Sequence, residues 1–289
     1  MMNILVTGAN GQLGSELKLQ AGDYPHCKFF FTDVKELDIC NIQDVLTYVR
    51  SNDIDLIINC AAYTAVDKAE TDIEKARLIN VEAVKNLVKA CESEKAKLIH
   101  VSTDYVYNGE YYKPLSEDMK VSPIGVYGVT KQEGEEVVIK AGIESIVIRT
   151  SWLYSSYGNN FVKTMMRLGA ERDDLGVIFD QVGTPTYACD LARVILQIMN
   201  REGRLDAAGK IYHFSNEGVA SWYDFAKEIM DCAGIVCEVR PIKTEDYPTP
   251  AQRPHYSVLD KTKIKCDFRI EIPYWKDSLK KCIELMSKR

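Results

Sequence analysis

The sequence of 289 residues predicts a doubly wound α/β fold, in which helices cover both faces of a parallel sheet. In the first half, short apolar runs typical of buried strands alternate with segments whose apolar residues recur every three or four positions, as in amphipathic helices. The expected strands are residues 3–7, 28–32, 56–60, 98–102 and 145–149. The expected helices between them are residues 12–20, 42–51, 74–93 and 130–141.

The second half is less regular and predicts a smaller α/β lobe. Helices are expected at residues 161–168, 190–200 and 222–233, the last capped by Ser221, with strands at 176–179 and 210–215. The proline-rich segment 242–254 is expected to be a loop. We therefore expect a first domain of residues 1–150, to which segments at about 177–220 return. A discontinuous lobe made mainly of residues 151–289 completes the molecule.

Composition and charge exclude several classes of protein. The formal net charge of −6, without a run of lysine or arginine, argues against a nucleic-acid partner. An apolar run of the ~18 residues needed to cross a membrane is absent, and the start does not resemble a signal peptide. The nine scattered cysteines and four histidines lack metal-ligand spacing. We expect a cytoplasmic protein with no membrane partner and no metal site.

A glycine-rich loop joins the first expected strand to the first expected helix. Its three glycines allow a tight turn, close approach of a pyrophosphate and close packing of the helix on the strand. The phosphates of a dinucleotide would then sit at the positive end of that helix. This context predicts a Rossmann-type nucleotide site, although the spacing G-x-x-G-x-x-G differs from the simplest fingerprint. The residues expected to bind the cofactor here are Gly8, Asn10, Gly11, Gln12, Leu13 and Gly14.

Further cofactor contacts are expected where later strands end. Asp33, 19 positions beyond Gly14, would bind the adenosine ribose and favour NAD over NADP. Lys35 could offset that charge, so the choice between NADH and NADPH stays open. Asp38 and Ile39 either flank the adenine or are an ordinary loop residue and a core residue. The third strand is followed by small and aromatic residues expected to line the cofactor site, namely Ala61, Ala62 and Tyr63.

Three side chains form a candidate catalytic group. Thr103 follows the fourth expected strand, and Tyr127 precedes Lys131 by four residues, which places both on one face of a helix. Reduction of a ketone needs a hydride and a proton for the oxygen. An ammonium beside a phenol lowers its pKa from about 10 and eases proton transfer. Lys131 could also hold the nicotinamide ribose, and the Thr103 hydroxyl could bond the carbonyl oxygen.

These residues together resemble the extended short-chain dehydrogenase/reductase family. More narrowly, the chain is similar to the dTDP-4-dehydrorhamnose reductases. The similarity covers nearly the whole chain, although Tyr107 and Asn108 stand where that family usually has Phe-Asp. The segments that carry it are residues 102–109 (STDYVYNG), 127–135, 149–152, 180–186 and 253–260.

The resemblance implies reduction of the 4-keto group of dTDP-4-dehydro-L-rhamnose to dTDP-L-rhamnose, with NADPH or NADH, for cell-surface polysaccharide. Tyr127 would be the proton donor, Lys131 its pKa partner and cofactor ligand, and Thr103 the group that tunes the tyrosine. The resemblance also implies a homodimer. The substrate contacts it implies are Thr103, Asp104, Tyr127, Trp152, Asn160 and Arg253.

Some members of the family bind Mg²⁺ through glutamates, one of them at the position of Glu16. Asp190 lies in a similar region to another ligand, but the sequence does not match the full set. We therefore expect Glu16 to be a surface charge of the first helix, and binding of Mg²⁺ stays open.

Two alternatives remain open. A nucleotide-sugar dehydratase or epimerase would share this fold, but dehydratases carry an acidic residue where this chain has Tyr105. A non-catalytic nucleotide-binding regulatory subunit would have no physical need of Thr103, Tyr127 and Lys131 together.

Overall fold

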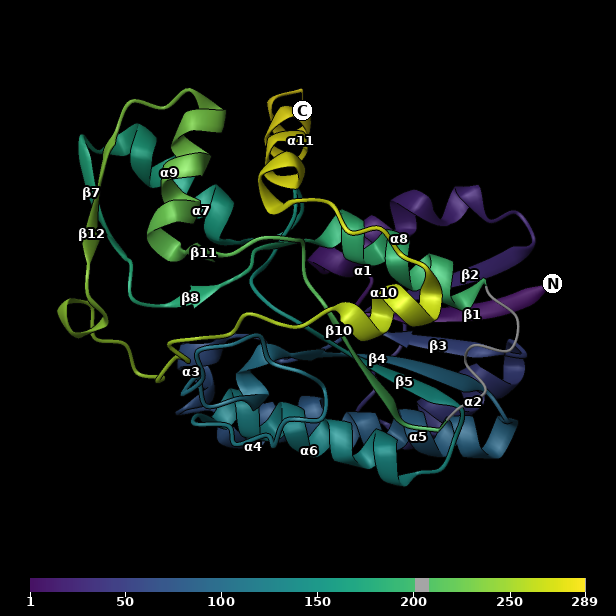
Figure 1. Cartoon of the computed structure of the whole chain (residues 1–289). Coiled ribbons are helices and arrows are strands. Elements are labelled where there is room, and N and C mark those ends of the chain that lie inside the picture. Colours follow the sequence, from purple (N-terminus) through teal and green to yellow (C-terminus); the bar gives the residue numbers. More distant parts are fainter. Residues whose placement is uncertain (201–207, 289) are drawn as a thin grey trace.

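The computed structural model describes residues 1–200 and 208–288 and has a central six-stranded parallel sheet (Figure 1). The strand order is β10-β5-β4-β3-β1-β2, so the chain runs outward in both directions from β1 and β3. The doubly wound fold class predicted from the sequence is confirmed. The strands are β1 (Met2–Thr7), β2 (Cys27–Thr32), β3 (Leu56–Asn59), β4 (Lys97–Thr103), β5 (Ser145–Thr150) and β10 (Lys210–Phe214).

Helices cover both faces of this sheet because successive strand residues point to opposite sides. Ile4 and Val6 pack in one apolar cluster, whereas Leu5 between them packs in the other. On the first face lie α1 (Gln12–Gln20), α8 (Ala188–Met199) and α10 (Thr262–Phe268). On the second lie α2 (Ile42–Ser51), α5 (Ala83–Glu94) and α6 (Val126–Lys140).

The helix expected at residues 74–93 is interrupted by a π-helical turn, Leu78–Glu82, between α4 (Ile73–Arg77) and α5. Asn80 on this turn donates to Thr130 Oγ1 on α6 (3.0 Å) and accepts the Tyr63 N–H (2.9 Å). The backbone of the turn also lies against Gly134, where a Cβ would stand 2.3 Å from the Asn80 carbonyl oxygen. Such turns are typical where a helix is locally widened by a specific contact.

The smaller lobe lies at the upper left of Figure 1, on the side to which the sheet strands point. Its core contains Phe225, Ile229 and Leu279 from two of its helices. It consists of α7 (Phe161–Glu171), β7 (Asp174–Ile178), α9 (Trp222–Ala233), β12 (Glu238–Ile242) and α11 (Trp275–Ser287). Two short strand pairs connect it to the sheet, β6 (Leu153–Tyr154) with β9 (Thr186–Tyr187) and β8 (Val182–Gly183) with β11 (Ala220–Ser221).

Several elements differ from the sequence-based expectation. Helix α6 begins at Val126 rather than at residue 130, so Tyr127 lies inside its first turn. The start was missed because Gly125 and Gly128 weaken the helical pattern of the sequence. Glycine nevertheless suits both positions, since a Cβ there would crowd neighbouring atoms. At Gly128 a Cβ would stand 2.3 Å from the Tyr105 carbonyl oxygen. Helices α10 and α11, the short helix α3 (Val66–Ala69) and strand β12 were not expected.

The later segments of the chain are shared between the sheet and the lobe. Strand β10 pairs with β5, and α8 packs beside α1 in the same apolar cluster. The domain limits themselves stay a prediction. Within residues 1–200 and 208–288, no helix combines the length and apolar character that crossing a bilayer demands.

Candidate active site

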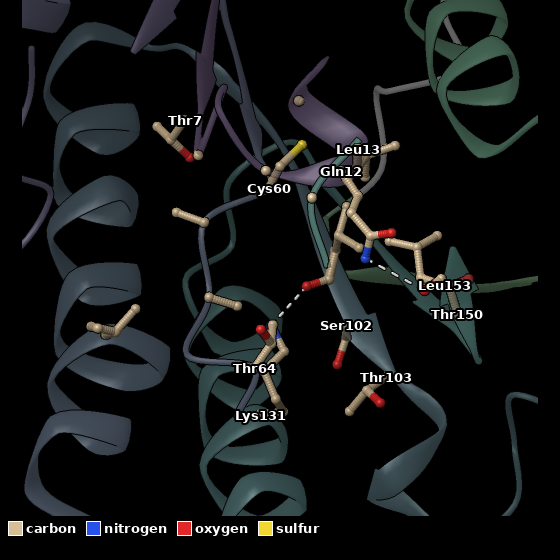
Figure 2. Close-up of a pocket in the computed structure, with 18 of the residues that line it drawn as sticks. Thr7, Gln12, Leu13, Cys60, Thr64, Ser102, Thr103, Lys131, Thr150 and Leu153 are labelled. Atoms are coloured by element: carbon tan, nitrogen blue, oxygen red, sulfur yellow. Dashed lines mark hydrogen bonds between the residues drawn. The ribbon is translucent and has the colours of Figure 1, made fainter. Parts of the chain in front are cut away.

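A cleft of about 720 Å³ opens where β1, β3, β4 and β5 end. Figure 2 shows part of its lining, with Ser102 and Thr103 from the end of β4 near Lys131 from α6. Ligands of open parallel sheets bind at this edge of the sheet. The sequence-predicted residues that line it are Gly8, Gly11, Gln12, Leu13, Gly14, Asp33, Asp38, Ile39, Ala61, Ala62, Thr103, Asp104, Tyr127, Lys131, Trp152 and Asn160.

The glycine-rich loop has the geometry needed to hold a pyrophosphate. Gly8 has φ +65°, and a Cβ there would stand 2.7 Å from the Ala61 backbone nitrogen. Helix α1 starts after Gly11, and among the described residues no side chain caps this end. Its first N–H groups therefore face the cleft unpaired, as a bound phosphate requires. These residues fit a dinucleotide.

Asp33 is fixed beside this loop at the end of β2. Its Oδ2 accepts the Asn10 N–H (3.1 Å), and its Oδ1 accepts the Val34 N–H (2.8 Å). The carboxylate thus stands at the position expected for the ribose contact, and Lys35 beside it is exposed. Asn10 acts through its backbone and lies outside the described cleft wall.

Tyr63 is likewise not among the residues of that wall, and its expected contact with the cofactor stays a prediction. Its phenol donates to Asp72 Oδ2 (3.2 Å), and its ring packs with Ala69 and Ala76. The chain turns after Ala62 so that the side chain enters this small apolar cluster. Tyr63 therefore anchors the loop after β3 from behind.

Thr103 and Tyr127 are linked at the floor of the cleft. The Thr103 hydroxyl donates to Asp104 Oδ1 (3.1 Å) and accepts the Tyr105 N–H (3.2 Å). The Tyr127 ring meets the Tyr105 ring edge to face, with 5.4 Å between centroids. Burial raises the pKa of Tyr127 to about 12, and a hydrogen bond with Thr103 opposes this rise. The phenol therefore keeps its proton at neutral pH, as a proton donor must.

This differs from the expected lowering of the Tyr127 pKa by Lys131. The Lys131 ammonium is drawn to the end of β4, where it donates to the Val101 carbonyl oxygen (2.7 Å) and lies 3.5 Å from His100 Nε2. Burial lowers the pKa of Lys131 to about 8, and the Glu135 carboxylate opposes this shift. Burial is thus the largest cause of the pKa shift at both Tyr127 and Lys131.

Trp152 forms the side of the cleft nearest the smaller lobe. It adopts φ +47°, which is rare for a bulky residue, and its indole stacks on Trp222 of α9 with 3.6 Å between centroids and 9° between planes. A Cβ at Gly183 would stand 2.8 Å from this indole. The wall of the cleft is therefore built jointly by the sheet and the lobe.

The comparisons with known proteins identify a family for this chain. The family described as "RmlD substrate binding domain" matches residues 2–288. The dTDP-4-dehydrorhamnose reductase of Aggregatibacter actinomycetemcomitans is 43% identical over 288 residues, which cover 97% of this chain and 98% of that protein. The chain belongs to the dTDP-4-dehydrorhamnose reductase family.

Solved structures of the family have the same fold. The dTDP-4-dehydrorhamnose reductase of Clostridium acetobutylicum superposes with a TM-score of 0.93 at 43% identity, covering 99% of this chain and 100% of that chain. The enzyme of Bacillus anthracis, solved in complex with NADP, gives a TM-score of 0.92 at 37% identity, covering 99% of each chain.

Two of the family-derived substrate contacts, Asn160 and Arg253, hold other parts of the chain in the structure. Asn160 lines the cleft, but it caps α7 by accepting the Lys163 N–H (3.1 Å) and donates to Gln12 Oε1 (3.0 Å). Arg253 is not among the residues that line the main cleft, and its guanidinium pairs with Asp67 (2.7 Å). It lines a second cavity of about 280 Å³ together with Tyr247.

A metal centre is not among the features of the described residues, where His, Cys, Asp and Glu side chains form no group suited to a metal ion. Glu16, expected as a surface charge, is 1% exposed and accepts a hydrogen bond from Ser155 Oγ (2.6 Å). Glu16 is covered by helix α8, which packs against α1, and by the segment that follows β6. Asp190 is likewise engaged, by Asn216 (2.8 Å) and Ser278 (2.5 Å).

Several lining residues were missed by sequence reasoning. Five of them, Thr7, Thr32, Cys60, Ser102 and Thr150, stand at or just after the ends of strands, a position from which they could have been found. The remaining ones belong to no recognisable sequence pattern. They are Val34, Leu37, Cys40, Thr64, Val66, Ile79, Val101, Tyr105, Ser151, Leu153, Gly158 and Asn159.

Proposed function

We propose that this chain catalyses the NAD(P)H-dependent reduction of the 4-keto group of dTDP-4-dehydro-L-rhamnose to dTDP-L-rhamnose. The observation that carries the proposal is one continuous cleft lined by a phosphate-binding glycine loop at one end and by Thr103, Tyr127 and Lys131 at the other. Membership of the dTDP-4-dehydrorhamnose reductase family supports the choice of sugar.

Each side chain of the cleft has its own role in the proposed reduction. Tyr127 donates its phenolic proton to the C4 oxygen as the hydroxyl group forms. Thr103, hydrogen-bonded to Tyr127 and to Asp104, orients the phenol and the ketone. Lys131 binds the cofactor ribose, and the bound nicotinamide supplies the hydride. The stacked Trp152 and Trp222 offer an apolar face to the sugar nucleotide.

Tyr105 favours a reductase over a dehydratase. Burial raises the pKa of its phenol further above its ordinary value, and the charge of Asp104 acts in the same direction. A phenol held protonated in this way cannot do the work of the acidic residue that dehydratases place at this position.

The test is to mix the purified protein with NADPH or NADH and dTDP-4-dehydro-L-rhamnose. We expect loss of the reduced-nicotinamide absorbance and formation of dTDP-L-rhamnose, with much less reaction for the C5-epimeric dTDP-4-dehydro-6-deoxy-D-glucose. NAD retained through purification, together with no consumption of added NADPH or NADH, would instead identify an epimerase or dehydratase. Binding of the nucleotides without turnover of either sugar would favour a regulatory subunit.

We also propose a cytoplasmic homodimer. The nine cysteines are free thiols in the described structure, as is usual in a reducing compartment. The dimer is inferred from the family and from the prevalence of twofold symmetry among soluble oligomers. Light scattering coupled to size-exclusion chromatography measures the oligomeric state directly, and a monomeric mass at micromolar protein would refute it.

A further inference from the structure

A row of buried polar side chains crosses the sheet directly behind Lys131. Thr7 of β1, Asn59 of β3 and His100 of β4 are register neighbours on adjacent parallel strands, so their side chains project from the same face. Thr7 Oγ1 donates to Asn59 Oδ1 (2.7 Å), and Asn59 Nδ2 lies 3.0 Å from His100 Nδ1. The row ends at Lys131, whose Nζ is 3.5 Å from His100 Nε2.

This row is unusual for its place in the fold. Two residues earlier on the same strands stand Leu5, Ile57 and Leu98, which belong to the apolar cluster beneath α5 and α6. His100 itself is fully buried, and its neighbour on β5 is Val147. A buried polar row is costly unless each member is paired, which argues for a specific use.

The hydrogen bonds define the tautomer of His100. Asn59 Oδ1 must be the acceptor for the Thr7 hydroxyl and for the Ala61 N–H (3.2 Å), so the amide NH₂ of Asn59 faces the imidazole. His100 Nδ1 therefore accepts, and the proton of the neutral ring is on Nε2. Burial and the nearby Lys131 lower the pKa of His100 well below its ordinary value, which keeps the ring neutral.

We propose that His100 is a positioning residue that directs Lys131 toward the cofactor side of the cleft. Its Nε2–H places a donor behind the ammonium, and two donors cannot bond each other. The contact is accordingly long, at 3.5 Å, whereas the bond to Val101 O is 2.7 Å. With one N–H donated to Val101, the other two are left for acceptors in the cleft that Lys131 lines, such as the ribose hydroxyls of a bound cofactor.

The proposal rests on the proposed role of Lys131 in cofactor binding, but its test does not need the sugar substrate. The charged and titratable groups that act on Lys131 are Glu135 on its own helix, Cys60 after β3 and His100 on β4. The first measurement is the ¹⁵N spectrum of the histidine rings in the unaltered protein. We expect His100 to show the Nε2–H tautomer without titration between pH 6 and 9. An Nδ1–H tautomer, or titration in that range, would overturn the proposal.

The second measurement uses His100→Asn, in which the amide oxygen still accepts from Asn59 while the Nε2–H is lost. Water can then enter behind Lys131 and accept a hydrogen bond from its ammonium group, which favours the charged form. We expect the pKa of Lys131, followed by ¹³Cε NMR, to rise by about one unit. We also expect the dissociation constant for NADPH, followed by nicotinamide fluorescence, to increase about tenfold.

Val147→Ala is the matched control, because it removes buried volume at the register neighbour of His100 without touching the polar row. It should lower the melting temperature and leave both the Lys131 titration and the NADPH affinity unchanged. If the two variants lose stability but neither moves these quantities, His100 is merely structural and the proposal fails. In another outcome, the unaltered protein binds NADPH and the two variants have the predicted NADPH affinities, but no sugar is turned over. That result would refute the proposed function and would leave the role of His100 standing.

Discussion

The Arg149 guanidinium and the Glu135 carboxylate form a two-point ion pair in the interior, with Nη2 to Oε2 at 2.6 Å and Nε to Oε1 at 2.9 Å. The side chains are 3% and 2% exposed. Arg149 Nη1 also donates to the Tyr107 hydroxyl (2.7 Å), which in turn contacts His213. This network joins α6, which carries both Tyr127 and Lys131, to the last residues of β5.

Glu135→Gln should therefore lower the stability of the fold strongly. Removing one partner leaves the other charge buried without compensation, which costs about 3–5 kcal/mol. Glu136→Gln, one residue along the same helix, is the matched control, because its pair with Lys140 is exposed and worth less than ~1 kcal/mol. Urea denaturation at neutral pH measures both. Equal losses of stability in the two variants would show that the buried Glu135–Arg149 pair stabilises the fold no more than the exposed Glu136–Lys140 pair does.

Tyr127→Phe should lower turnover at least ~100-fold and leave cofactor binding nearly intact, because it removes only the proton that the ketone oxygen receives. Tyr105→Phe keeps the ring that packs against Tyr127 and removes a neighbouring hydroxyl. It should retain far more activity. Single-turnover kinetics with NADPH and the keto sugar distinguishes these variants, and near-wild-type turnover by Tyr127→Phe would remove that residue from the mechanism.

Asp33→Ala should shift the cofactor preference toward NADPH, because it removes a negative charge from the site of the 2′-phosphate. We expect the ratio of the NADH and NADPH dissociation constants to change by about tenfold, the size of one charge-assisted hydrogen bond. Asp38→Ala removes the same charge from the next loop and should change the ratio less, since that carboxylate is exposed and accepts the Cys40 N–H. An unchanged ratio in Asp33→Ala would exclude the ribose contact.

The fold and the cofactor loop were predictable because local patterns decide them. The bounds of α1 and α2 follow from amphipathic periodicity. Gly8 and Gly14 indicate a closely packed connection between β1 and α1, because a side chain at either position would collide with the backbone. The candidate catalytic side chains, at a strand end and one helical turn apart, could be brought to one cleft from the sequence for the same reason, and their roles stay a prediction. These are features of short stretches of sequence.

What could not be predicted depends on contacts between distant segments. The turning of Tyr63 toward Asp72, the pairing of Arg253 with Asp67 and the burial of Glu16 are all set by tertiary packing. The high pKa of Tyr127 is likewise a consequence of burial, which the spacing of Tyr127 and Lys131 does not reveal.

Trp222→Ala should weaken binding of the dTDP-sugar more than it slows the chemical step. Trp152 lies in an unfavourable left-handed backbone conformation, and the stack on Trp222 holds its indole against the cleft. Such ring pairs are worth about 0.5–1.5 kcal/mol, so KM should rise up to ~10-fold. Trp222→Phe keeps an aromatic face and should recover most of the loss. A fall in kcat at constant KM would contradict this account of the wall.

Asp104 makes the stability of the protein depend on pH. Burial raises its pKa from 3.8 to about 6, although the hydroxyls of Ser257 and Thr103 act against the shift. A folded-state pKa above the unfolded value means that the stabilising contribution is complete below pH about 4 and is lost as pH rises through about 6. The loss is about 3 kcal/mol, since each pKa unit is worth about 1.4 kcal/mol.

Asp104→Asn removes this titration while keeping the shape of the side chain. The variant should therefore be more stable than the unaltered protein at pH 8, by up to about 3 kcal/mol, and nearly equal to it at about pH 3. Denaturant unfolding at the two pH values measures the difference, in which the titrations of all other carboxylates cancel. A stability difference independent of pH would show that Asp104 is already compensated in the folded state.

If Asp104 contacts the substrate as the family resemblance implies, the same variant should also bind the sugar nucleotide less tightly, because the stability lost at Asp104 would then serve binding.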